Sequence, residues 1–132
     1  MIDNQYLLDL IRNFPNVQTE LLVNDGTEFI LGDPGEVVIR IQSEELTVSE
    51  YSVVWEGHRP VMHPPQIAIL CWRLIPKDNL TMVVQTLIDA TSALRRSKYS
   101  ACSRCKEIKP PEWMHDSQTC QGCAVQYLGV VY

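Results

Sequence analysis

Hydrophobic positions near the N-terminus recur at helical spacing and predict a helix over residues 3–13. Five apolar side chains fall on one face of this helix: Tyr6, Leu7, Leu10, Ile11 and Phe14. Asp3 can cap the first turn, because a short polar side chain accepts hydrogen bonds from free backbone N–H groups. Pro15 stops the helix, so the chain must turn there.

The pattern then changes to short runs that predict four strands, at residues 17–23, 27–32, 36–42 and 46–56. In the third run, Val37, Ile39 and Ile41 alternate with polar residues, as in a strand with one buried face. The runs are separated by the turn-forming segments NDG and DPG, in which glycine accepts positive φ without penalty. Together they predict a four-stranded antiparallel meander.

Residues 57–65 contain three prolines and predict an irregular segment, because proline lacks a backbone donor. The apolar residues 66–75 fit a buried strand, a short buried helix or a packed extended loop. The clearest helix of the sequence follows over about 79–97, with Asn79 as its cap. Its apolar face consists of Leu80, Val83, Val84, Leu87, Ile88, Thr91 and Leu94.

Length and composition set the fold class. The 132 residues are 45% hydrophobic and 20% charged, which is ordinary for a globular protein. We expect an α+β body at 1–98 and a small C-terminal module at 99–132. No apolar run is long enough to span a bilayer, and the first residues lack the basic and apolar regions of a signal peptide. These observations predict a cytoplasmic protein.

The net charge of −5 is unevenly distributed. Residues 1–94 carry five basic and thirteen acidic side chains, a net −8, whereas residues 95–132 carry six basic and three acidic ones, a net +3. The basic residues at the end of the long helix suit the negative end of its dipole. A metal ion held by four thiolates brings the tail to about +1. Nucleic acid is therefore a poor partner on charge alone, and a protein partner is expected.

Four of the five cysteines form two C-x2-C pairs separated by fourteen residues: Cys102, Cys105, Cys120 and Cys123. Two residues between thiolates let both sulfurs reach one ion, and the intervening segment can return the second pair. Zinc is the expected ion. Rubredoxin-like iron, a disulfide and free thiols are the alternatives. Because cysteine fills all four positions, no place remains for a reactive water, and the expected metal is structural.

The segment CSRCKEIKP, which begins at Cys102, resembles the metal-binding knuckle of the treble-clef and zinc-ribbon families. This resemblance covers about 30 residues, implies a metal-stabilised fold without activity, and does not distinguish the two families. His115 lies between the cysteine pairs, as in the His-Asn-His nucleases. Those enzymes need further polar metal ligands after the second pair, and here the chain continues as AVQYLGVVY.

The predicted order of elements in the body is similar to the core of the ubiquitin-conjugating enzymes. GEVVIRI, from Gly35, resembles that family's glycine-led third strand, and YSVVW, from Tyr51, resembles the start of its fourth. LTMVVQTLI, from Leu80, resembles the long helix after the active site. His63 and the proline after it match the start of the family's His-Pro-Asn motif, and Cys71 follows as the catalytic cysteine does in that family.

The resemblance implies that Cys71 carries a ubiquitin-like modifier as a thioester and that His63 belongs to the active site. The sequence departs from the family at Pro65, which replaces the motif's asparagine, and in the C-terminal module, which replaces helices. The apolar neighbours Ile69, Leu70 and Trp72 instead favour Cys71 as a small buried core residue.

Three functions follow from the sequence: a thioester carrier, a non-catalytic protein-binding module stabilised by zinc, and a zinc-dependent nucleic-acid-binding protein. The sequence does not determine the partner or the oligomeric state.

Overall fold

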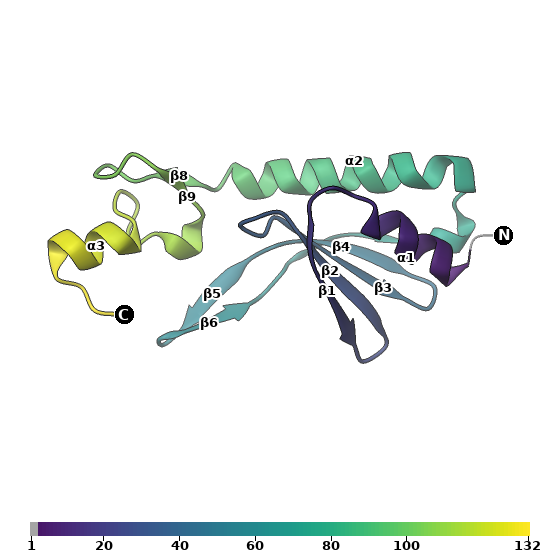
Figure 1. The fold of residues 1–132 in the computed structure, drawn as a ribbon, viewed down its shortest axis with the longest axis horizontal. Helices are drawn as coiled ribbons and strands as arrows, with labels where there is room; N and C mark the ends of the chain where they lie inside the picture. The colour runs from purple at the N-terminus through teal and green to yellow at the C-terminus, as the bar shows by residue number, and fades with distance from the viewer. Residues whose placement is uncertain (1–2) are drawn as a thin grey trace.

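The computed structural model describes residues 3–132 and shows an α+β fold (Figure 1). An N-terminal helix precedes a strand meander, and a long helix leads to a C-terminal helix beside the cysteine cluster. In chain order the elements are α1 (Asn4–Arg12), β1 (Val17–Val23), β2 (Gly26–Leu31), β3 (Val37–Gln42), β4 (Leu46–Glu50), β5 (Val53–Glu56), β6 (Arg59–Met62), β7 (Gln66–Leu70), the 3-10 turn η1 (Trp72–Leu74), α2 (Lys77–Arg96), β8 (Ser100–Ala101), β9 (Ile108–Lys109), the 3-10 turn η2 (Pro111–Trp113) and α3 (Gln121–Leu128).

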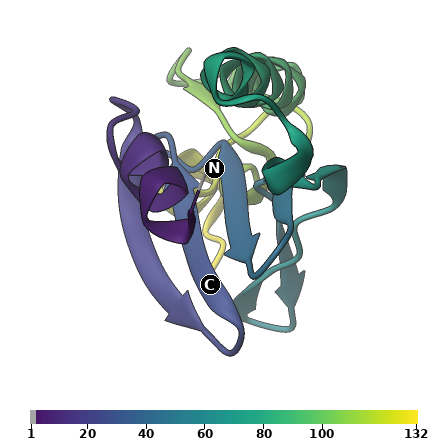
Figure 2. The same ribbon diagram turned by 90° about the vertical axis from the view of Figure 1, so that its right-hand side faces the viewer.

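The central sheet is antiparallel and has the order β1-β2-β3-β4-β7. Alternate residues of its middle strands point to one face, so that Phe29 lies opposite Ile39, and Ile39 lies opposite Val48. These side chains are fully buried and form one core with Leu7 of α1 and Val84 of α2. Both helices therefore cover the same face of the sheet, as the end-on view shows (Figure 2).

The predicted helices are confirmed, with one shifted boundary. The Asp3 carboxylate accepts a hydrogen bond from the Tyr6 N–H at 2.8 Å, as expected of a cap. The prediction of Asn79 as the cap of the long helix is wrong, because α2 already begins at Lys77. The Asn79 N–H donates to the carbonyl of Pro76, which occupies the cap position. Among the described residues, no helix combines the length and apolar character needed to cross a bilayer.

The sheet differs from the predicted meander at its fourth strand. The expected strand over 46–56 divides at residues 51–52, where β5 leaves the sheet and pairs with β6 as a separate hairpin. The prediction that 57–65 is irregular is wrong for Arg59–Met62. Pro60 has no backbone N–H to donate. It is tolerated here because each strand of a two-stranded hairpin has a free edge, so not every residue needs to donate a hydrogen bond to a neighbouring strand. The ambiguous segment 66–75 supplies β7, which pairs with β4 as a fifth strand.

The β2–β3 pairing leaves no room for a side chain at Gly26. A Cβ atom built at this position would lie 1.8 Å from the backbone carbonyl oxygen of Ile41. We therefore expect Gly26→Ala to lower the free energy of unfolding by about 1–3 kcal/mol or more, because the backbone of β3 cannot move without breaking the ladder. Denaturant unfolding followed by circular dichroism measures the loss. Gly57→Asn is the control, since Gly57 has positive φ and no atom within 4 Å of a Cβ. Equal stabilities of the two variants would contradict this packing.

Candidate metal centre

The first cysteine pair lies on a short hairpin. The strands β8 and β9 pair through Ala101 and Ile108, and the chain between them turns tightly. The Cys102 N–H donates to the Glu107 carbonyl, and the Lys106 N–H donates to the Cys102 carbonyl, both at 2.9 Å. Lys106 adopts a φ of 67°, which closes the turn. The turn brings the sulfur atoms of Cys102 and Cys105 close together.

The second pair lies at the start of α3. Cys120 is the N-cap of this helix, and its sulfur accepts a hydrogen bond from the Cys123 N–H at 3.5 Å. The segment between the pairs folds back so that the second pair lies beside the first. A hydrogen bond from the Ser103 N–H to the Gln118 carbonyl, at 2.7 Å, holds the two parts together.

The structure brings the four predicted ligands together. All four sulfur atoms lie within 4.8 Å of one another, and the Cys105 and Cys120 sulfurs are 3.9 Å apart. Tetrahedral coordination at about 2.3 Å places sulfurs about 3.8 Å apart, so the cluster fits one four-coordinate ion. Cys102, Cys120 and Cys123 are buried, whereas Cys105 is exposed. The four cysteines can therefore hold a metal ion, and water would reach only one of the four cysteine side chains, that of Cys105.

The thiol pKa values differ strongly within the cluster. Hydrogen bonds from the Cys105 and Cys120 backbone N–H groups lower the pKa of Cys102 to about 6. Burial raises the pKa of Cys123 to about 12. Four adjacent thiolates repel one another, so complete deprotonation of the cluster needs a cation at its centre.

The segment between the cysteine pairs also contacts the body through a buried ion pair. Glu112, in η2, pairs with Arg95 in the last turn of α2, and the two side chains are 7% and 3% exposed. Arg95 Nε also donates to the Gly35 carbonyl at 3.3 Å, and the guanidinium lies over the rings of Tyr51 and Tyr99. This cluster connects the long helix, the β2–β3 turn and the cysteine-rich module.

The backbone of Glu112 makes two further contacts that join the hairpin to the metal site. Its carbonyl accepts hydrogen bonds from Trp55 Nε1 at 3.1 Å and from Gln121 Nε2 at 3.0 Å. Trp55 belongs to β5, and Gln121 directly follows Cys120. Glu112 therefore contacts both the β5–β6 hairpin and the start of α3.

Cys71 and His63, the residues of the proposed thioester chemistry, lie at opposite ends of β7. Cys71 follows the strand and is exposed, contrary to the burial favoured by its apolar neighbours. Trp72, which is fully buried, takes the core position beside it. The His63 N–H donates to the Ser52 carbonyl at the other end of the strand. Because the five residues of β7 span about 13 Å, the two side chains do not form one site.

His115 lies outside the sulfur cluster. Its ring shares a hydrogen bond with the Tyr132 hydroxyl, and the two rings meet edge to face. The group of metal-ligating side chains found among residues 3–132 consists of the four cysteines alone. His115 is therefore an exposed histidine beside the site.

Comparisons with models of known protein families, with curated proteins and with solved structures find no match for this chain.

Sequence reasoning missed the Arg95–Glu112 pair and the role of Trp55. The sequence predicts that the basic residues at the end of the long helix complement its dipole, whereas one of them, Arg95, is almost completely buried. A weak signal existed in the helical period, since Arg95 follows Thr91 by four residues and Ile88 by seven, and therefore shares their buried face.

The ion pair gives a stability prediction. Glu112→Gln should lower the free energy of unfolding by about 3–5 kcal/mol, because Arg95 would remain charged and buried without its partner. Denaturant unfolding of the metal-loaded protein measures this. Glu56→Gln is the control, because its partner Arg59 is exposed and such pairs contribute about 0–1 kcal/mol. Similar losses in both variants would show that the buried pair has no special role.

Proposed function

We propose that the four cysteines bind one structural zinc ion and that the zinc-stabilised module and the α+β body together form a non-catalytic protein-binding unit. The observation that carries this proposal is the cluster of four sulfurs within 4.8 Å of one another. Zinc is favoured because a site of four thiolates selects zinc or iron, and zinc is the usual ion of closed structural sites. When bound, the ion would hold the four thiolates together and offer no open position for catalysis.

A protein partner is supported by charge and by surface. The body is strongly acidic, and two basic side chains at the end of α2 and just after it are already engaged: Arg95 pairs with Glu112, and Lys98 contacts both carboxylate oxygens of Glu50 at 2.8 Å. Few free cations remain for a phosphate backbone. Apolar side chains such as Val125 and Tyr127 on α3 are about half exposed, which suits contact with a protein.

The metal proposal is tested by measuring the metal content of the protein. Purified protein should contain one zinc per chain by elemental analysis, and Cys105→Ser should lose most of it, since the site then lacks one thiolate. Cys71→Ser is the matched control and should keep its zinc, because Cys71 is outside the cluster. Iron in place of zinc, or metal-free protein under reducing conditions, would refute the proposal.

A second candidate is the thioester carrier, and the exposure of Cys71 favours it. The Cys71 thiolate would attack the thioester carbonyl of an activated ubiquitin-like modifier. A new thioester forms, and the thiolate of the upstream carrier leaves. An acceptor amine then attacks that carbonyl, forms an amide and releases the Cys71 thiol. His63 lies too far along β7 to assist, so the proposed chemistry would depend on Cys71 with groups other than His63.

The second candidate predicts a distinct product. Incubation with a modifier, its activating enzyme and ATP should give a conjugate that reducing agent removes and that Cys71→Ala cannot form. Native labelling with iodoacetamide should first show one reactive thiol per chain, since Cys71 is exposed and metal protects the other four. A labelled Cys71 that forms no conjugate with any modifier tested would reject the enzyme and leave the protein-binding unit.

A further inference from the structure

One of the four clustered cysteines differs from the others in its exposure. Cys102, Cys120 and Cys123 are 0%, 5% and 6% exposed, whereas the side chain of Cys105 is open to solvent. Cys105 lies in the turn of the β8–β9 hairpin, which projects beyond the end of α2 (Figure 1), and every residue from 103 to 108 is exposed. Solvent therefore reaches the sulfur cluster mainly through Cys105.

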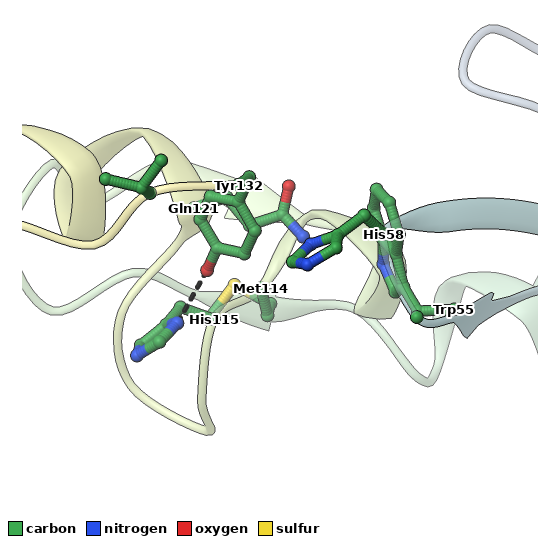
Figure 3. Close-up of a pocket in the computed structure, with 8 residues that line it drawn as sticks. Trp55, His58, Met114, His115, Gln121 and Tyr132 are labelled. Carbon is green, nitrogen blue, oxygen red and sulfur yellow. Dashed lines mark hydrogen bonds between the residues drawn. The ribbon is translucent and has the colours of Figure 1, made fainter.

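The three buried cysteines are covered by the rest of the module. Met114 packs against them, and it lies beside the hydrogen-bonded side chains of His115 and Tyr132 (Figure 3). A surface cavity of about 320 Å³ borders Cys120, yet that side chain is almost completely buried. A small reagent in solution therefore meets Cys105 before it meets the other three ligands.

Exposure decides which ligand reacts once a metal ion is bound. A thiol that coordinates a metal is deprotonated, so all four sulfurs are then thiolates. The thiolate is the form that peroxides oxidise, and susceptibility follows exposure. The ion draws electron density from each sulfur, so Cys105 reacts more slowly than the free and exposed thiol of Cys71. It still reacts faster than the buried ligands.

A second sulfur lies close enough to Cys105 to form a disulfide with it. The Cys105 and Cys120 sulfurs are 3.9 Å apart, in a cluster whose sulfurs all lie within 4.8 Å of one another. The bond length of a disulfide is about 2.05 Å, so these two sulfurs need to approach by about 2 Å. Peroxide-sensitive cysteines are often placed beside such a second cysteine, which converts the first oxidation product to a disulfide.

We propose that Cys105 is the site at which hydrogen peroxide oxidises the zinc-loaded protein and that Cys120 completes the oxidation to a disulfide. The Cys105 thiolate attacks one peroxide oxygen, so that an S–O bond forms, the O–O bond breaks and hydroxide leaves. The Cys120 thiolate then attacks the Cys105 sulfur, so that the S–S bond forms, the S–O bond breaks and a second hydroxide leaves. Two thiolates are oxidised, one peroxide is reduced, and two protons from solvent convert the hydroxides to water.

This oxidation releases the metal, because two of its four thiolate ligands are lost and the remaining two cysteines do not complete a tetrahedral site. The segment between the bonded cysteines contains Glu112, the buried partner of Arg95 in α2. Oxidation therefore acts on the part of the module that contacts the body. The inference rests on the proposed zinc site and adds that this site responds to an oxidant.

The test follows zinc and sulfur together in the full, zinc-loaded chain carrying Cys71→Ser, which removes the other exposed cysteine. About one zinc should be released to an indicator dye per peroxide consumed. Dimedone, which traps sulfenic acid, should first modify Cys105, and mass spectrometry should identify a Cys105–Cys120 disulfide. Dimedone found first on a buried ligand would overturn Cys105 as the site, and a Cys102–Cys105 disulfide would overturn the role of Cys120.

Two variants separate exposure from metal binding. Histidine is also a ligand of structural zinc, so Cys105→His and Cys123→His each keep a four-ligand site. Cys105→His should slow peroxide-driven zinc release at least about tenfold, whereas Cys123→His should slow it less than about threefold, because it keeps the exposed cysteine. Equal rates in the two zinc-loaded variants would refute the proposal. If Cys123→His does not take up zinc, the dimedone mapping decides alone.

Metal analysis before oxidation separates this inference from the function on which it rests. Protein that contains no zinc at the outset refutes the proposed metal site itself. Protein that contains zinc and keeps it in excess peroxide refutes the oxidation site and leaves the metal proposal standing. A phosphine reductant should restore zinc binding after oxidation, since a disulfide is reversible. Zinc loss that reductant cannot reverse would contradict the disulfide.

Discussion

The buried ion pair between Arg95 and Glu112 is the interaction on which the arrangement of this protein depends. It joins the end of α2 to η2, and Arg95 extends the connection to the β2–β3 turn through the Gly35 carbonyl. Two charges buried together are costly to separate, because each would lose its partner without regaining water. The pair therefore fixes how the cysteine-rich module sits on the body.

The cysteine cluster and the body are consequently joined by hydrogen bonds at their boundary. Gln121 directly follows Cys120 and its side chain donates to the Glu112 carbonyl, which also accepts a hydrogen bond from Trp55 of the hairpin. Loss of metal would loosen the residues that present Glu112. The division of the chain into a body at 1–98 and a module at 99–132 describes the sequence well, yet it cuts through this buried contact.

The two candidate chemistries lie on different parts of the molecule. The four sulfurs gather between the β8–β9 hairpin and the start of α3, whereas Cys71 follows β7 and precedes η1 and the start of α2. Exposure of Cys71 satisfies one requirement of a nucleophile. His63 lies beyond the other end of β7, away from Cys71. The resemblance to the ubiquitin-conjugating enzymes implied that it would lie in the same active site. The metal centre, by contrast, has all of its expected ligands in one place.

The sequence by itself determined the helices α1 and α2, the four-stranded meander and the set of four clustered cysteines, because helical period, strand alternation and C-x2-C spacing are local properties of the chain. Only the tertiary structure decided that β7 joins the sheet, that 59–62 forms a hairpin with β5, that Cys71 is exposed and that Arg95 is buried. These features depend on partners far away in the chain: Glu112 lies 17 residues from Arg95 and 57 from Trp55. Burial of a charge is set by what packs over it, and that packing has no local signature.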